Sequence, residues 1–156
     1  SGKELVVYIS MGFGNPYSDS YDAETAIMWV GKLHQLGIRI ISLADTVGVA
    51  EPDTISYIFS HLVPEFNDVT IGAHFHSTPE KWEEKIAAAW HAGCRRFDSA
   101  LKGIGGCPMA DDDLVGNIAT ENITAWCRQQ NIPLRLNEAA FDEALSKAAH
   151  VFRKIS

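Results

Sequence analysis

Two histidines stand two positions apart in the segment GAHFH, residues 72–76. The residues just before them are mostly small or apolar, which is typical of a buried strand. Side chains at positions i and i+2 of a strand point to the same face, so His74 and His76 are expected to lie side by side. Two neutral imidazoles in that arrangement can share one metal ion. The alternative is that one histidine packs in the core and the other faces solvent.

Two further polar residues stand where predicted elements begin or end. Asp45 ends an apolar run, where a carboxylate is costly to bury without a partner. It is either an active-site carboxylate or a cap for the next turn, through the amides of Thr46 or Val47. Asn117 follows a glycine where a helix is expected to begin. Its amide oxygen could face a hard cation, or its side chain could cap that helix.

Cys107 lies in the segment GIGGCP, residues 103–108. Three glycines allow this loop to bend sharply and to approach a ligand closely. A thiol in such a loop could donate or accept a proton, and the alternative is an ordinary loop cysteine. The acidic run at 111–113 is interpreted as a solvated loop, with a lid as the alternative. Cys94 and Cys127 are expected to be packing residues.

Strands and helices alternate in the pattern that must position these residues. Apolar runs predict four strands, at residues 4–10, 38–45, 69–76 and 95–101. Helical periodicity predicts a helix over 20–37, a second beginning at Asp53, and a third capped by Thr78 and ended by Gly93. A loop is expected over 102–117, followed by helices over about 118–129 and 138–154.

This alternation predicts parallel βα units with right-handed crossovers in a single domain, residues 1–156. Two architectures fit: a small doubly wound sheet, or half of a (β/α)8 barrel. In both, active sites form at the carboxyl ends of the strands, which is where the polar residues gather. Asp98 also belongs to the fourth strand, but alternation predicts that it points toward a neighbour rather than into the site.

Composition excludes some partners. The 156 residues carry a formal net charge of −7, which argues against nucleic acid or an anionic membrane surface. No apolar run approaches the roughly 18 residues of a membrane span, and no signal peptide is recognised. Three cysteines without a zinc pattern favour a reducing compartment over a disulfide framework. We therefore expect a cytoplasmic protein, or one of an organelle matrix if its source is eukaryotic.

Several longer segments together resemble a known family. These are YISMGFGNPY, ISLADTVGVAEP, IGAHFHSTPE, GIGGCP and GNIATE, in this order. In this order and spacing they resemble the C-terminal half of hydroxymethylglutaryl-CoA lyase, a metal-dependent TIM-barrel carbon–carbon lyase with a pyruvate carboxyltransferase-like domain. The two-histidine pattern is shared with related aldolases and synthases, whereas the glycine-rich loop with its cysteine is more specific to the lyases.

The resemblance implies a role for each matching residue. His74, His76 and Asn117 match metal ligands, with His74 also placed at the catalytic centre. Cys107 matches a loop cysteine that acts in acid–base chemistry, Asp45 matches an active-site aspartate, and the role of Glu121 is not fixed.

The implied reaction is a retro-Claisen cleavage of an acyl-CoA to acetyl-CoA and acetoacetate, assisted by Mg²⁺ or Mn²⁺. It belongs to leucine degradation and ketone body metabolism. The oxygen-rich site suits these cations better than zinc.

Two departures from the family pattern affect these expectations. Ser77 stands where the family usually has an acidic residue, and Pro79 and Glu80 also differ, so substrate preference could differ. The first four βα units of the family barrel, with a metal-binding aspartate and a catalytic arginine, have no counterpart in this sequence.

The chain is therefore expected to form barrel strands 5 to 8 and the trailing helices, and to be inactive alone. It is also expected to form a homo-oligomer, in which two half-barrels pair.

Two rival functions remain open. The first is another enzyme of the superfamily, such as a 4-hydroxy-2-oxoacid aldolase or an isopropylmalate-type synthase, and the Cys107 loop argues against it. The second is a non-catalytic domain that binds a metal or a partner.

Overall fold

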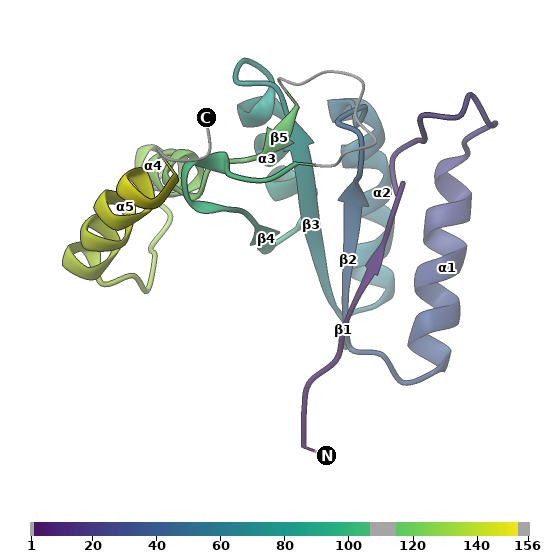
Figure 1. The fold of residues 1–156 in the computed structure, drawn as a ribbon. Helices are drawn as coiled ribbons and strands as arrows, with labels where there is room; N and C mark the ends of the chain where they lie inside the picture. Colours follow the sequence, from purple (N-terminus) through teal and green to yellow (C-terminus); the bar gives the residue numbers. More distant parts are fainter. Residues whose placement is uncertain (1, 107–114, 153–156) are drawn as a thin grey trace.

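A parallel sheet in chain order forms the centre of the computed structural model, which describes residues 2–106 and 115–152. Its strands pair in the order β1-β2-β3-β4 (Figure 1). A short fifth strand, β5, runs antiparallel to the end of β3. The bounds are β1 Val6–Ile9, β2 Ile40–Asp45, β3 Thr70–Ser77, β4 Arg96–Asp98 and β5 Gly116–Asn117.

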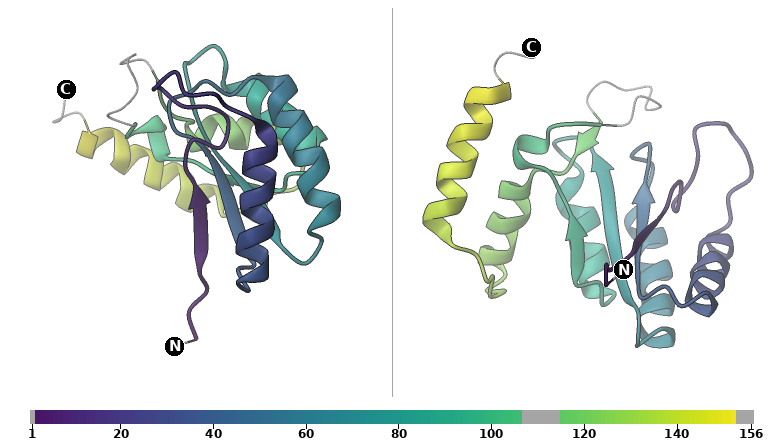
Figure 2. Two further views of the ribbon diagram at one scale, coloured as in Figure 1. Left: turned by 90° about the vertical axis from the view of Figure 1, so that its right-hand side faces the viewer. Right: turned by 60° about the horizontal axis from the view of Figure 1, so that its bottom comes forward.

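Five α-helices and one 3₁₀ turn complete the described chain. They are α1 Ala23–Gln35, α2 Pro52–Glu65, α3 Trp82–His91, the 3₁₀ turn η1 Leu101–Gly103, α4 Thr120–Gln129 and α5 Glu138–Phe152. Helices α1, α2 and α3 lie on the same side of the sheet, and successive helices contact one another (Figure 2). In a doubly wound fold the strand order reverses and helices cover both faces. The predicted parallel βα units are confirmed, and their sequential order is that of a barrel wall.

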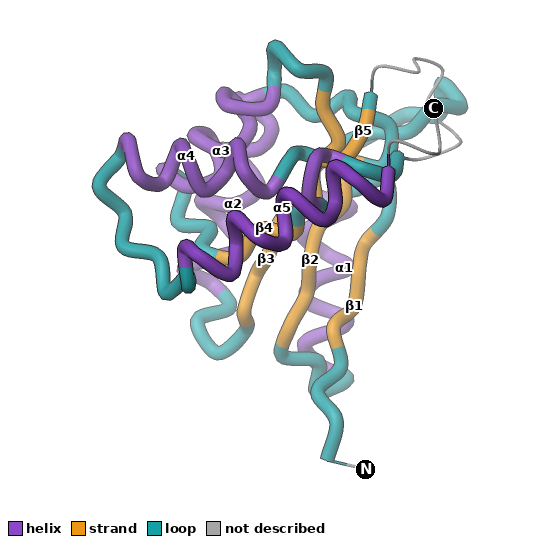
Figure 3. The backbone as a smooth tube through the Cα atoms, turned by 60° about the vertical axis from the view of Figure 1, so that its left-hand side comes forward, coloured by secondary structure: helices purple, strands orange, loops and turns teal. Residues whose placement is uncertain are grey.

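The hydrophobic core fills the space between the sheet and these helices. Leu43 of β2 and Phe75 of β3 are at most 1% exposed and belong to the same cluster as Ile58 and Phe59 of α2. Their neighbours along each strand point to the other face of the sheet. As Figure 3 shows, none of helices α1 to α3 of the described chain covers that face. The sheet is therefore apolar on one face and open on the other.

The helix starts differ from the predicted ones. The N-cap of α2 is Glu51 and Pro52 is its first residue, so Asp53 lies inside the first turn and is not the cap. Helix α3 begins only at Trp82. The amide of Lys81 donates to the carbonyl of Thr78 at 3.3 Å, which closes a turn before the helix, so the prediction of Thr78 as its cap is wrong.

The region after β4 is more structured than predicted. The fourth strand is only three residues long and leads into η1, and the expected loop 102–117 contains β5. Asn117 pairs with His76 in this strand, while the N-cap of α4 is Ala119, so the capping alternative for Asn117 is wrong.

One outer edge of the sheet is formed by β1, which has no partner on its other side among the described strands. Within the same ranges, no helix has the length and apolar character needed to cross a bilayer.

Candidate functional site

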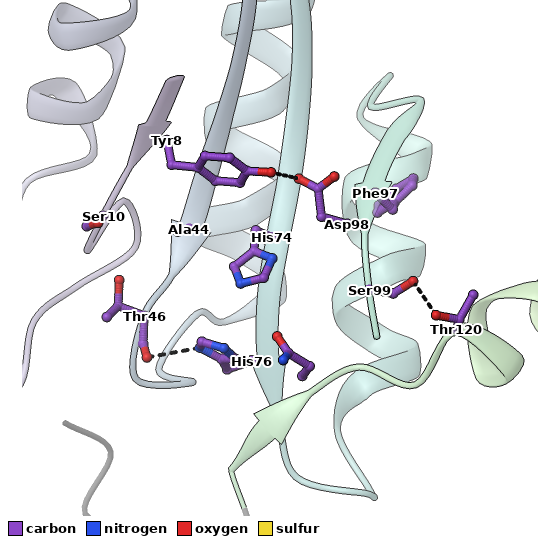
Figure 4. A pocket seen from close by; sticks show the side chains of 11 residues that line it. Tyr8, Ser10, Ala44, Thr46, His74, His76, Phe97, Asp98, Ser99 and Thr120 are labelled. Atoms are coloured by element: carbon purple, nitrogen blue, oxygen red, sulfur yellow. Dashed lines mark hydrogen bonds between the residues drawn. The ribbon is translucent and has the colours of Figure 1, made fainter. Parts of the chain in front are cut away.

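A cavity of about 800 Å³ lies on the open face of the sheet, at the carboxyl ends of the parallel strands. Figure 4 shows its side chains converging from β1, β2, β3 and β4. It is lined by Tyr8, Ser10, Ala44, Thr46, His74, His76, Phe97, Asp98, Ser99, Asn117 and Thr120. The structure thus brings His74, His76 and Asn117 to one place, as the sequence predicted for the strand ends.

The two histidine rings lie together, with centroids 5.1 Å apart and planes at 76°. His76 is only 7% exposed, and its Nδ1 lies 3.0 Å from the carbonyl oxygens of both Asp45 and Thr46. Carbonyl oxygens only accept hydrogen bonds, so Nδ1 carries the proton of the neutral ring. The lone pair therefore resides on Nε2, which is the arrangement that a metal-binding histidine needs.

His74 is half-buried, and its Nδ1 has no hydrogen-bond partner among the described residues. Burial lowers the pKa of this imidazole, and the neighbouring His76 lowers it further. The carboxylates of Asp98 and Asp45 act in the opposite direction but are weaker. His74 is therefore held in the neutral form, which is the form that donates an electron pair to a metal.

Asn117 presents an oxygen to the same site. Its Nδ2 donates to the carbonyls of Ile104 and Gly105 at 3.0 and 3.1 Å, which fixes the orientation of the amide. Its Oδ1 is buried and has no partner within the described ranges. Asn117 also stands opposite His76 in the pairing of β5 with β3.

These three residues fit part of a divalent metal site. Each offers an uncommitted donor atom, two of nitrogen and one of oxygen, and a buried polar atom without a partner is costly unless a ligand satisfies it. No group of three His, Cys, Asp or Glu side chains that could hold a metal occurs in the described part of the chain. A hard cation such as Mg²⁺ or Mn²⁺ would therefore need further oxygen ligands from elsewhere.

Asp45 is not brought to the cavity. Its side chain lies on the helix-covered side of the sheet and is fully buried. Its Oδ2 accepts from Lys85 Nζ at 2.7 Å and its Oδ1 from the amide of Ala50 at 3.1 Å. Asp45 thus caps the turn that follows it, as the capping alternative predicted, but it accepts the amide of Ala50 rather than that of Thr46 or Val47. Only the backbone carbonyl of Asp45 reaches the site, through its bond with His76.

Cys107 lies outside the described residues, as do Asp111, Asp112 and Asp113, so their predicted roles stay predictions. The loop segment just before Cys107 is described. Gly103 has φ +64°, and a Cβ there would come 2.8 Å from the carbonyl oxygen of Asn117, so only glycine fits. Glu121 accepts a hydrogen bond from the amide of Lys102 at 3.0 Å and thereby fastens the start of this loop to α4.

Sequence reasoning missed a polar network beside His74. Tyr8 donates to Oδ2 of Asp98 at 3.0 Å, and Ser42 donates to the same oxygen at 3.1 Å. Asp98 lines the cavity, so the prediction that it points away from the site is wrong. Tyr8 and Ser10 stand at positions i and i+2 of the predicted strand 4–10, the same spacing as the histidines, and this signal could have identified Tyr8.

Comparison with known proteins relates most of the chain to one family. The family model described as HMGL-like matches residues 5–147. The chain is 34% identical over 139 residues to the (R)-citramalyl-CoA lyase of Chloroflexus aurantiacus, covering 89% of this chain and 44% of that protein.

Two solved structures are also similar. The HMG-CoA lyase of Bacillus subtilis matches with a TM-score of 0.85 and 31% identity, over 97% of this chain and 49% of that one. An HMG-CoA lyase from Acinetobacter baumannii in complex with coenzyme A and 3-methylmalate matches with a TM-score of 0.78 and 32% identity, over 90% of this chain and 46% of that one. The chain thus spans about half the length of these relatives.

Proposed function

Since the chain belongs to the HMGL-like family, we propose that it supplies half of the active site of an acyl-CoA carbon–carbon lyase. The observation that carries this proposal is the convergence of three uncommitted donor atoms, from His74, His76 and Asn117, on one cavity at the strand ends. We propose that the other half of the site comes from polypeptide that this chain does not contain.

The proposed chemistry divides between binding and proton transfer. His74, His76 and Asn117 hold a divalent cation, Mg²⁺ or Mn²⁺. The bound cation supplies a Lewis acid that stabilises negative charge on substrate oxygens. A base takes up the proton of the substrate hydroxyl, whose oxygen becomes the carbonyl oxygen of the released keto acid as the adjacent carbon–carbon bond breaks. The bonding electrons pass to the acetyl-CoA enolate, whose carbon then takes up a proton.

We assign the final proton transfer to Cys107. The glycine loop that precedes it is fastened to β5 by the bonds of Asn117 and to α4 by Glu121, so its base is fixed beside the cavity. An acid–base group of this kind typically contributes about 10²–10⁴-fold to the rate. Asp45 has no proton-transfer role in this proposal, because its carboxylate is paired with Lys85 outside the cavity.

The metal site is tested by titrating Mn²⁺ into the purified chain in a calorimeter. Binding to the native chain should be lost in His74→Ala and retained in His91→Ala, which removes an exposed histidine of α3. Undiminished binding in His74→Ala would contradict the proposed ligand set. Weak binding by the native chain would mean that the ligands from the other half dominate the affinity.

The lyase activity is tested in a chimeric enzyme. The part of the Bacillus subtilis relative that this chain does not cover would be joined to it, and acetyl-CoA release would be measured with and without Mn²⁺. Cys107→Ser should lower kcat by about 10²–10⁴-fold. A rate unaffected by Cys107→Ser would favour an aldolase-type reaction, and no turnover in any variant would favour a non-catalytic binding domain.

The substrate is the finer question. We propose hydroxymethylglutaryl-CoA, and the similarity to a citramalyl-CoA lyase supports (R)-citramalyl-CoA as a second candidate. Both are 3-hydroxy-acyl thioesters that release acetyl-CoA on cleavage of the same bond. The ratio of kcat/KM for the two in the chimera decides between them.

We also propose that the isolated chain pairs with a second copy. The outer edge of β1 is unpaired within the described structure, and Tyr8 and Trp29 beside it are each 47% exposed. An uncovered strand edge is a template for another chain. Light scattering coupled to size-exclusion chromatography should give a dimer mass, and a monodisperse monomer would contradict the pairing.

A further inference from the structure

A deeply buried positive charge belongs to Lys85 of α3, whose side chain is 1% exposed. It lies on the apolar face of its helix, beside Ile86 and Ala89, where a lysine is costly unless its ammonium is fully paired. The ammonium has three hydrogens, and three acceptors surround it. These are Oδ2 of Asp45 at 2.7 Å and the carbonyl oxygens of Gly48 and His76, each at 2.9 Å.

These three acceptors come from three different parts of the chain. Asp45 ends β2, Gly48 lies in the turn that follows, and His76 lies near the end of β3. Lys85 therefore ties the turn after β2 to the strand that carries the histidines. The carboxylate of Asp45 completes this arrangement by accepting the amide of Ala50, at the far end of the same turn.

The same turn also holds the ring of His76. The carbonyls of Asp45 and Thr46 both accept from Nδ1, each at 3.0 Å. The carbonyl of Asp45 additionally accepts the amide of Gly48 at 3.3 Å, so its position depends on the shape of the turn. His76 is thus attached to the turn twice, directly through its ring and indirectly through its backbone carbonyl and Lys85.

We propose that Lys85 is a positioning residue for the site. By fixing the turn over residues 45–50, it holds the two carbonyls that keep the proton of His76 on Nδ1 and the lone pair on Nε2. The role of Lys85 in metal binding rests on the proposed function, whereas its effect on the position of the His76 proton does not depend on that function. Residues that orient a ligating histidine typically change metal affinity by about 10–100-fold when they are removed.

The rival explanation is that Lys85 and Asp45 form an ion pair that only stabilises the fold. The two explanations differ in what a neutral replacement of the pair should do. Buried ion pairs can often be replaced by uncharged residues without loss of stability. Such a replacement keeps the fold but removes the donors to the carbonyls of Gly48 and His76.

Three variants of the chain test this difference. Lys85→Met keeps most of the side-chain volume and removes the charge, but leaves Asp45 unpaired and could unfold the protein. The double variant Lys85→Met with Asp45→Asn removes both charges and keeps an acceptor for the amide of Ala50. Lys81→Met is the matched control, because Lys81 immediately precedes α3 and pairs with Glu51 in an exposed position.

The main readout is the tautomer of His76, from nitrogen-15 NMR of the ring without metal or substrate. The native chain and Lys81→Met should show a single tautomer protonated at Nδ1. The double variant should keep its thermal unfolding midpoint near the native value, lose the single tautomer, and bind Mn²⁺ about 10–100-fold more weakly.

A folded double variant with the native tautomer would overturn the proposal, and so would loss of folding in both Lys85 variants, because either result leaves Lys85 only a structural role. Failure of the native chain to bind Mn²⁺ would instead count against the proposed function. The tautomer would still decide the role of Lys85.

Discussion

The two faces of the parallel sheet perform different tasks with residues that alternate along the same strands. On the helix-covered face, Phe75 is 1% exposed, and the centroid of its ring lies 5.4 Å from that of Phe13. On the open face, its neighbour His74 points into the cavity with an unsatisfied nitrogen among the described groups. Alternation in a strand therefore lets one segment contribute to the core and to the site at once.

Each face also contains one feature that would be expected on the other face. The covered face holds the buried charges of Lys85 and Asp45, which connect the core to the site. The open face is tightly packed at Gly72, where a Cβ would come 2.6 Å from Oγ of Ser42 and 2.9 Å from Cδ of Arg96. The difference between the faces thus concerns polarity more than packing.

The largest expected effect is a difference in stability between alanine variants of two adjacent residues, Phe75 and His74. Phe75→Ala should lower the free energy of unfolding by about 3–5 kcal/mol, because it leaves a cavity in the core. His74→Ala should cost at most about 1 kcal/mol and yet remove Mn²⁺ binding. Chemical denaturation of both variants measures the contrast. Equal losses of stability would show that the open face contributes to the core as much as the covered face does.

A smaller effect concerns glycine. Gly72→Ala should lower the free energy of unfolding by about 1–3 kcal/mol, because the added methyl group meets Ser42 and Arg96. Gly31→Ala is the control, since a Cβ there has its nearest contact at 3.6 Å, to Phe66. Because Gly31 lies in the middle of α1, Gly31→Ala should raise the free energy of unfolding by about 0.5–1 kcal/mol. A neutral Gly72→Ala would mean that the open face is loosely packed.

The smallest effect is a pH dependence that arises from His74. Burial lowers the pKa of His74 below its ordinary value of 6.5, so the folded protein binds fewer protons there than the unfolded chain. The free energy of unfolding should therefore fall as the pH drops from about 6.5 toward the lowered pKa. His74→Gln should make this decline less steep, and His91→Gln should leave it unchanged. Identical pH profiles for the native chain and His74→Gln would contradict this account of His74.

The sequence predicted the βα order and the placement of the two histidines on one strand face, because both depend on local patterns. Strand periodicity places His74 and His76 on one face, and parallel pairing brings strand ends together, so no long-range information was needed. The two-residue strand β5 was missed, since a pair of residues carries no periodicity. Asn117 was nevertheless a candidate from its position after Gly116, and the family resemblance, which does not depend on secondary structure, implied that it is a metal ligand.

The pairing of Lys85 with Asp45 was not predicted, because the partners lie 40 residues apart on different elements. A signal existed on each side: Lys85 interrupts the apolar stripe of its helix, and Asp45 ends an apolar strand. Two isolated opposite charges in otherwise buried patterns favour a mutual partner. Cys107 and the predicted cation stay predictions, supported by the resemblance and by the donor atoms around the cavity.

The sequential order of the parallel strands also has a consequence for how the sheet assembles. Val6 pairs with Ile40, Ile40 with Thr70, and Gly72 with Arg96, so each strand joins the one made just before it. The contact order is therefore set by the length of one βα unit rather than by the length of the protein. Such a sheet can grow strand by strand as the chain leaves the ribosome, with each new unit docking on a finished edge.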